Sequence, residues 1–322
     1  MNILIYHYGA LGDFITALPS FRFFKNRYSG TVTLLGKREY GTLALQSEYV
    51  DTILDADSSS HRFVFSPLTA TGELQSFFGQ FKVVVLFTGK DATISENARK
   101  SCPGKLYLPP PIPPSHRHAI DRYFDLFPEE KFLPEDVPKI SVPAVSSGGR
   151  ISEAFFREHH PYIVIHPGSG SPRKNWPFEH FIKVASAIHN SGYTIVWLSG
   201  PVDRQTGFPE SDIRFSRLSL PECSLLLKHG SAYLGNDSGI THLAAATGTN
   251  VAAIFGPSDP VLWAPRGTGG ITVLYHPPAE GCSPCHLQPT GKQHSCNHSC
   301  MRQITVEEVL ETLTSLTGTD IT

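Results

Sequence analysis

Short apolar runs, rich in β-branched residues, recur along the chain and alternate with longer mixed segments. Their hydrophobicity is continuous rather than alternating, which is typical of parallel strands that are covered on both faces. We predict strands at these runs, which occupy residues 3–6, 32–35, 83–87, 162–165, 195–198, 251–255 and 271–274.

The segments between the predicted strands show helical periodicity. After Phe178, the apolar residues fall on one face of a helix, at Phe181, Ile182, Ala185 and Ile188. Near the end of the chain, Thr305 and Glu308 form a T-x-x-E capping box, which predicts a helix over residues 305–317. Strands that alternate with helices indicate an α/β architecture.

The chain of 322 residues is long enough for two domains. A small-residue stretch at 145–150 favours a break there, giving domains 1–150 and 151–322 with a ligand cleft between them. The proline-rich run at 109–114 is either a recognition segment or a rigid surface loop within the first domain.

Composition excludes several classes of protein. With 27 Lys and Arg against 29 Asp and Glu, the net charge is −2, which argues against a dedicated nucleic-acid binder. No apolar run approaches the roughly 18–20 residues of a membrane span. The first apolar run is broken by His7 and Asp13, so we see no signal peptide and expect a cytoplasmic protein.

The first candidate motif, Gly-Ala-Leu-Gly-Asp at 9–13, lies between the first strand and a predicted helix. Asp13 has two interpretations. It is either an N-cap whose carboxylate accepts hydrogen bonds from free backbone N–H groups of the helix, or a general base at the mouth of the cleft. The spacing of Gly9 and Gly12 does not fit a dinucleotide fingerprint.

The second motif spans 166–177 and combines small residues, hydroxyls and the cations Arg173 and Lys174. Backbone amides, hydroxyls and a lysine suit a diphosphate, although a solvated surface loop would have the same composition. It lacks the P-loop pattern.

The third motif spans 234–243 and again reads as strand, turn and helix. Ser238 and Gly239 at a helix start offer N–H groups to an anion. Asp237 by itself could be an N-cap, and His242, one turn into the helix, could be a core histidine.

Six cysteines are too few for a disulfide framework, but four of them cluster late in the chain. They are either ligands of a structural zinc or reduced thiols in a loop, and four thiolates would leave no open position for a catalytic metal. The four are Cys282, Cys285, Cys296 and Cys300.

Together these segments resemble glycosyltransferase family 9, the ADP-heptose:lipopolysaccharide heptosyltransferases. The resemblance rests on 3–19, on the P-G-S…K-x-W-P loop within 166–177, and on 235–267. It implies a GT-B fold of two Rossmann-like domains, with an acceptor-binding domain at 1–150 and a nucleotide-sugar domain at 151–322. It also implies that the final helix, 305–317, packs back on the N-terminal domain.

The resemblance implies an inverting, metal-independent heptose transfer in which Asp13 is the general base and Gly12 belongs to the acceptor-side loop. His7 stands where the family often has arginine. The implied nucleotide-sugar site consists of Ser169, Lys174, Asp203, Asp237, Ser238, Gly239 and His242.

The implied partners are ADP-heptose as donor and the lipid A–core oligosaccharide as acceptor, without a cofactor or nucleic acid. A lipid-linked acceptor implies peripheral contact with the cytoplasmic face of the inner membrane. Two alternatives keep the nucleotide-sugar site: a sugar-nucleotide 2-epimerase and a non-catalytic nucleotide-sugar or glycan-binding protein.

Overall fold

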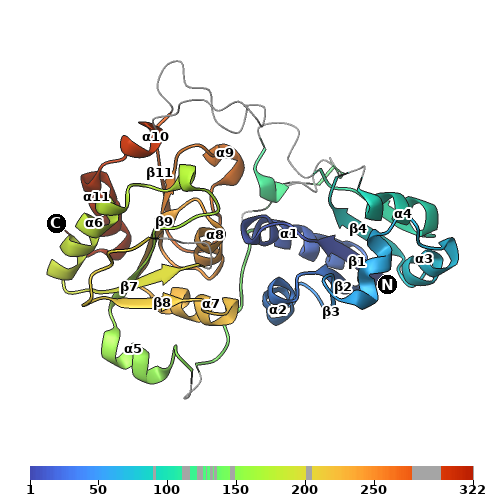
Figure 1. Cartoon of the computed structure of the whole chain (residues 1–322), viewed down its shortest axis with the longest axis horizontal. Helices are drawn as coiled ribbons and strands as arrows, with labels where there is room; N and C mark the ends of the chain where they lie inside the picture. The colour runs from blue at the N-terminus through green and yellow to red at the C-terminus, as the bar shows by residue number, and fades with distance from the viewer. Residues whose placement is uncertain are drawn as a thin grey trace. The chain divides into compact units, whose positions relative to one another are not determined.

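A computed structural model describes two α/β units, Met1–Ser141 and Val142–Thr322 (Figure 1). The structure describes residues 1–89, 92–110, 117–121, 126–127, 129–130, 133, 136–145, 149–200, 205–277 and 299–321. No helix within these ranges is long and apolar enough to cross a membrane.

The N-terminal unit is built on a parallel sheet with the strand order β3-β2-β1-β4-β5. Its strands are β1 (Asn2–His7), β2 (Thr31–Gly36), β3 (Thr52–Asp55), β4 (Val83–Phe87) and β5 (Lys105–Tyr107).

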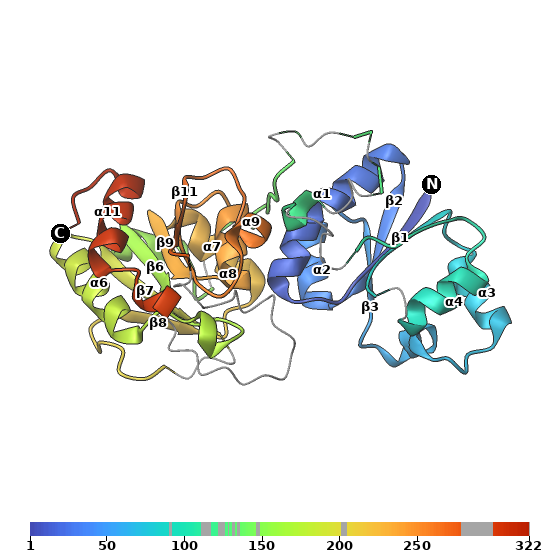
Figure 2. The same cartoon turned by 90° about the horizontal axis from the view of Figure 1, so that it is seen from above.

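Helices cover both faces of this sheet, with α1 and α2 on one side and α3, α4 and η1 on the other (Figures 1 and 2). Strand residues of alternate parity fill the two cores, because successive side chains of a strand point to opposite faces. The helical elements are α1 (Leu11–Arg27), α2 (Arg38–Gln46), η1 (Ser59–Phe65), α3 (Thr71–Phe78) and α4 (Thr93–Ser101).

The C-terminal unit contains a second parallel sheet, with the order β11-β10-β9-β6-β7-β8. Its strands are β6 (Tyr162–His166), β7 (Thr194–Ser199), β8 (Ile213–Ser216), β9 (Ala232–Asn236), β10 (Val251–Phe255) and β11 (Ile271–Tyr275).

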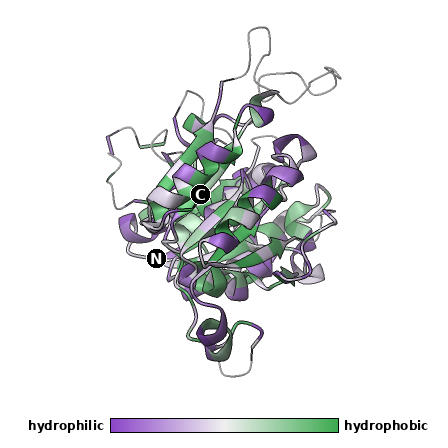
Figure 3. Cartoon of the chain, turned by 90° about the vertical axis from the view of Figure 1, so that its left-hand side faces the viewer, coloured by the Kyte–Doolittle hydropathy of each residue, from purple (hydrophilic) through white to green (hydrophobic). Residues whose placement is uncertain are grey.

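Helices α6 and α11 cover one face of the second sheet, and α7 and α8 cover the other (Figures 1 and 2). On the side that carries α6 and α11, the helices show hydrophobic and hydrophilic residues side by side, as amphipathic covering helices do (Figure 3). The helical elements are α5 (Glu153–His159), η3 (Pro172–Lys174), α6 (Phe178–Asn190), α7 (Leu220–His229), α8 (Gly239–Ala246), α9 (Pro260–Trp263), α10 (Ser299–Arg302) and α11 (Val306–Thr317).

The predicted α/β architecture is confirmed, and every predicted apolar run lies in a parallel strand. The predicted capping box of α11 is present, with Thr305 as N-cap and Glu308 bonded back to it. Val309 and Leu313 of α11 are buried in the same core as the apolar residues of α6. The apolar face of α11 therefore packs within the C-terminal unit.

Three strands escaped prediction, namely β3, β5 and β8. Each lies at the edge of its sheet and has three or four residues that are half-buried or exposed. Such strands have one paired neighbour and need no continuous apolar run, so hydrophobic patterning does not mark them.

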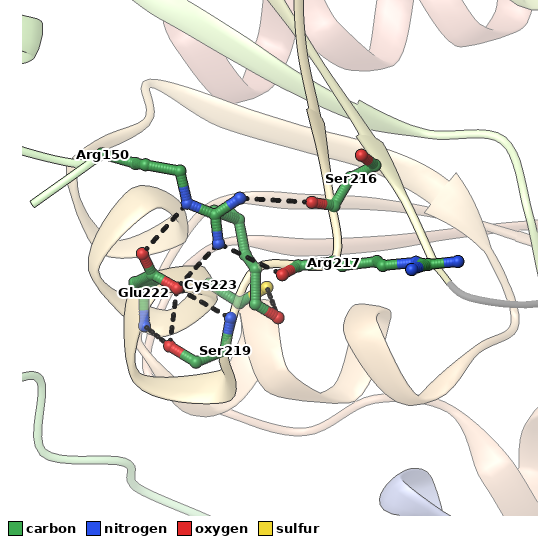
Figure 4. Close-up of polar contacts among 7 residues, drawn as sticks. Arg150, Ser216, Arg217, Ser219, Glu222 and Cys223 are labelled. Atoms are coloured by element: carbon green, nitrogen blue, oxygen red, sulfur yellow. Dashed lines mark hydrogen bonds and ion pairs between the residues drawn. The ribbon is translucent and has the colours of Figure 1, made fainter.

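Arg150, which precedes the first helix of the C-terminal unit, makes hydrogen bonds to the end of β8 and to the start of α7 (Figure 4). Its guanidinium donates to both carboxylate oxygens of Glu222, at 3.3 and 3.1 Å, and to the carbonyl oxygens of Ser216 and Arg217. Glu222 in turn closes a capping box with Ser219. Although partial burial opposes it, the bonds from Ser219 and Arg150 hold the pKa of the Glu222 carboxyl below its ordinary value.

Candidate functional site

The order of the C-terminal strands creates a switch point between β6 and β9. From β6 the chain continues to β7 and β8 on one side, and from β9 it continues to β10 and β11 on the other. Loops that leave two such strands at their carboxyl ends diverge, and open α/β sheets bind ligands in the crevice between them. The two loops here begin at Pro167 and Asp237, so both predicted motifs of this unit flank one switch point.

The loop after β6 is held together by its own hydrogen bonds. The Ser169 hydroxyl lies 2.6 Å from Oδ1 of Asn175 and 2.7 Å from the carbonyl oxygen of Ser171. Ser171 caps the short helix η3 by accepting from the N–H of Arg173. Ser169 therefore shapes the loop, and η3 presents Lys174 at its end.

Lys174 and Asp237 join the two loops directly. The Lys174 ammonium donates to Oδ2 of Asp237 at 2.6 Å. The Asp237 side chain is 8% exposed and the Lys174 side chain 36% exposed, so the cation is the more accessible partner. The buried Asp237 carboxylate thus holds the half-exposed Lys174 ammonium at the switch point, where the ammonium can bind an anion.

Helix α8 begins where the third motif predicts, and its N-cap is Ser238. The Ser238 hydroxyl accepts from the N–H of Thr241 at 3.4 Å, so the alternative of Asp237 as N-cap is wrong. Gly239 is the first residue of the helix, and the N–H groups of a first turn have no acceptor within the helix itself. An anion beside Lys174 would therefore face the positive end of α8.

A chain of buried and half-buried polar groups supports this helix start. The Thr241 hydroxyl lies 3.0 Å from those of Ser238 and Tyr233, and Nδ1 of His166 lies 3.4 Å from the Ser238 hydroxyl. His242, on the same helix, is 5% exposed. His166 and Thr241 lie within the two predicted motifs, but the sequence analysis assigned them no role, and Tyr233 lies outside both motifs. A polar residue within a strand or helix carries no periodic signal that would mark such a contact.

The predicted general base lies at the corresponding switch point of the N-terminal sheet, where β1 and β4 are neighbours. Asp13 is half-buried in the first turn of α1. The N-cap is Ala10, whose carbonyl oxygen accepts from the N–H of Phe14, so the N-cap interpretation of Asp13 is wrong. Gly12, expected in an acceptor-side loop, lies instead in the same helical turn.

Aromatic rings and a lysine surround the turn beside Asp13. The Lys37 ammonium lies 5.0 Å from the ring centres of both Tyr8 and Tyr40 and 3.4 Å from the carbonyl oxygen of Gly9. A Cβ at Gly9 would lie 3.4 Å from Oδ2 of Asp13, so this turn passes close to the carboxylate. Burial raises the pKa of Tyr40, and the charge of Asp13 adds to the effect.

Several predicted residues lie outside the described ranges, among them Asp203, Cys282, Cys285 and Cys296. Cys300 is described and is buried on α10. Among the described residues, no group of three or more His, Cys, Asp or Glu side chains could hold a metal ion.

Comparison with known proteins identifies the family. The sequence profile of glycosyltransferase family 9 (heptosyltransferase) matches residues 83–289, which is more than half of the chain. The chain belongs to glycosyltransferase family 9. The loops after β6 and β9, and so the pair of Lys174 and Asp237, lie within the matched range.

Among the relatives of this family 9 protein is the lipopolysaccharide heptosyltransferase 3 of Escherichia coli, which is 30% identical over 114 residues. That alignment covers 32% of the chain and 34% of the relative, so the chain spans about a third of the length of this relative.

Two solved structures share the fold over nearly the whole chain. A family 9 glycosyltransferase of Veillonella parvula aligns over 98% of this chain and 97% of its own, with a TM-score of 0.73 and 17% identity. The ADP-heptose lipopolysaccharide heptosyltransferase II of Escherichia coli aligns over 98% of both chains, with a TM-score of 0.70 and 18% identity. The predicted fold class is thereby confirmed.

Proposed function

We propose that this family 9 protein is an inverting glycosyltransferase that transfers a heptose from ADP-heptose to the inner core of lipopolysaccharide. The names of similar proteins suggest both substrates. They are called lipopolysaccharide heptosyltransferases, which suggests the acceptor, and the name of one of them includes ADP-heptose, which suggests the donor. The lipid A–core oligosaccharide would bring the protein to the cytoplasmic face of the inner membrane. The reaction needs no cofactor and no nucleic acid.

The observation that carries the proposal is the pair of Lys174 and Asp237 beside the start of α8. A diphosphate that enters this switch point competes with Asp237 for the Lys174 ammonium and accepts from the first-turn N–H groups at Ser238 and Gly239. When the sugar leaves, the ADP oxygens gain negative charge, and these fixed donors stabilise it without a divalent ion. Asp203 is the proposed contact of the ribose, and His242 lines the same pocket.

On the acceptor side, Asp13 is the proposed general base. The acceptor oxygen attacks the anomeric carbon of the heptose while the bond from that carbon to the β-phosphate oxygen breaks. Asp13 accepts the hydroxyl proton as the new bond forms, which a sugar hydroxyl requires at neutral pH. A single displacement inverts the configuration and releases ADP. In this proposal residues 1–150 bind the acceptor and residues 151–322 bind the nucleotide sugar.

The test is a transfer assay with lipid A–core oligosaccharide as acceptor, followed by mass spectrometry, in the presence and absence of EDTA. We expect a mass increase of one heptose with ADP-heptose in both conditions, and none with UDP- or GDP-sugars. Asp13→Asn should abolish transfer while ADP affinity changes by no more than a few-fold. Epimerised donor without transfer would favour the 2-epimerase alternative, and binding without turnover would favour the non-catalytic one.

A further inference from the structure

The side chain of Asn236 bridges the two ends of the loop that carries Lys174. Asn236 is the last residue of β9 and is completely buried. Its Nδ2 donates to the carbonyl oxygen of Pro167 at 2.7 Å, and its Oδ1 accepts from the N–H of Trp176 at 2.9 Å. One amide therefore closes the loop at its first residue and again close to its end.

The chemistry of the two bonds fixes the orientation of the amide. A carbonyl oxygen can only accept and a backbone N–H can only donate, so the NH₂ group must face Pro167 and the oxygen must face Trp176. No shorter or purely apolar side chain could satisfy both groups at once. A buried carbonyl or N–H that loses its partner costs its full desolvation, so this bridge is a strong constraint on the backbone of the loop.

The two loop ends are not equally secured without Asn236. The Trp176 ring is buried in the core, and its indole N–H donates to the carbonyl oxygen of Ile304. The loop interior is cross-linked within itself by Ser169 and Asn175. Backbone pairing of β6 with β9 ends at His166 and Gly235, and Asn236 is the side chain that extends this tie to Pro167, the first residue of the loop.

We propose that Asn236 is a positioning residue for the diphosphate site, which it serves by holding the 167–176 loop in the geometry that presents Lys174. The inference rests on the proposed function, in which Lys174 binds the diphosphate. Asn236 precedes Asp237 in the chain, so the same strand end fixes the loop backbone through one residue and the ammonium through the next. The end of β9 therefore positions both the backbone of the 167–176 loop and the ion pair of Lys174 with Asp237.

The chain offers a control in Asn250, a half-buried residue that makes the same kind of amide bridge and lies 13 positions after Asp237 in the chain. Its Nδ2 donates to the carbonyl oxygen of Leu316 at 2.9 Å, and its Oδ1 accepts from the N–H of Gly270 at 3.0 Å. It precedes β10, at the opposite end of the sheet strands from the switch point. Asn250→Asp therefore disrupts a similar amide bridge, in a less buried setting, at the amino end of a strand rather than at the carboxyl ends that form the proposed site.

The experiment compares the full-length protein with Asn236→Asp and Asn250→Asp by calorimetric titration with ADP and by urea unfolding. Asn236→Asp turns the donor toward Pro167 into a carboxylate that repels the carbonyl oxygen. We expect ADP affinity to fall by about tenfold or more in Asn236→Asp and to stay within about threefold in Asn250→Asp. In the transfer assay the donor KM should rise while the acceptor KM does not.

A pH series adds a readout that general destabilisation would not give. A protonated carboxyl again has one donor and one acceptor, so lowering the pH from about 7.5 to about 5 should restore ADP affinity of Asn236→Asp relative to wild type. The wild-type series corrects for the titratable neighbours His166, Lys174 and Asp237. Asn236→Ser has no carboxyl and should show the same loss without the recovery; it also replaces Asn236→Asp if that variant does not fold.

Equal ADP affinities in the Asn236 and Asn250 variants would overturn the inference and leave Asn236 as a structural residue only. Loss of affinity in Asn236→Asp without recovery at low pH would also overturn the bridging account. Failure of the wild-type protein to bind ADP would instead count against the proposed function, so the two failures are distinguishable.

Discussion

Replacing Lys174 by alanine separates the role of its ion pair in stability from its role in ligand binding. In the free protein the ammonium pairs with Asp237 at 2.6 Å, so its removal leaves a carboxylate that is 8% exposed without its cation. In the proposed complex the same ammonium meets a diphosphate. Lys174→Ala should therefore lower the free energy of unfolding, because Asp237 loses its cation, and should also weaken ADP binding, because the diphosphate loses the same cation.

The two magnitudes follow from burial and charge. A hydrogen bond to a charged group contributes about 1.5–3 kcal/mol, but Lys174 is 36% exposed and water screens part of it. We expect the free energy of unfolding to fall by about 1–2 kcal/mol. Loss of a point charge from a diphosphate site should weaken ADP binding by more than about 1.4 kcal/mol, which is tenfold in Kd.

A double-mutant cycle with Asp237→Asn isolates the pair. Urea unfolding of the four proteins should give a coupling energy of about 1–2 kcal/mol, because the double variant leaves no buried charge unpaired. Calorimetry with ADP should show the tenfold loss in both proteins that lack Lys174 and no such loss in Asp237→Asn. Lys25→Ala is the matched control, since it breaks a 2.9 Å pair with Asp51 in the N-terminal unit.

Two results would refute this reasoning. An ADP affinity of Lys174→Ala within about threefold of wild type would remove Lys174 from the diphosphate site. A similar loss of ADP affinity in Lys25→Ala would show that the effect follows from general destabilisation rather than from the missing cation.

Three further predictions concern stability. Arg150→Met should lower the free energy of unfolding by about 1 kcal/mol at pH 7. The folded protein holds the pKa of Glu222 below its ordinary value of 4.5, so the difference in stability between this variant and wild type should shrink as the pH falls below that value, which urea titrations at several pH values would measure. Leu313→Ala truncates a fully buried side chain of α11 and should cost about 2–5 kcal/mol in the same assay, and a loss below about 1 kcal/mol would contradict its place in the core. Thr305→Ala removes the N-cap of α11 and should cost about 1 kcal/mol, measured as a lower melting temperature, whereas no change would mean that the capping box contributes nothing.

Hydrophobic patterning predicted the central strands of both sheets and the main amphipathic helices, because these elements bury continuous or periodic apolar surface. Val83–Phe87 and Val251–Phe255 match β4 and β10 residue for residue. The edge strands β3, β5 and β8 have three or four residues and no continuous apolar run, whereas the edge strand β11 has such a run and was predicted. Patterning therefore identified the strands that have a continuous apolar run, whether central or at an edge, and missed the short edge strands that lack one.

The start of α1 shows a different limit of prediction. A glycine followed by Asp13 at a strand end reads as a helix cap, yet the helix begins at Leu11 and Asp13 faces the turn at Gly9. Backbone hydrogen bonding decides where a helix begins, and a residue two positions inside it has a different direction from a cap. The sequence located the carboxylate but not its orientation.

By itself the sequence determined the α/β class, the two loops with anion-binding composition and the resemblance to family 9, because each is a local pattern of residue types. Only the tertiary structure brought Lys174 against Asp237 and placed the Asn236 amide across both ends of the loop. The residues of these contacts are about 60 to 70 positions apart in the chain. They become neighbours because β6 pairs with β9 across the switch point, and no local pattern encodes that strand order.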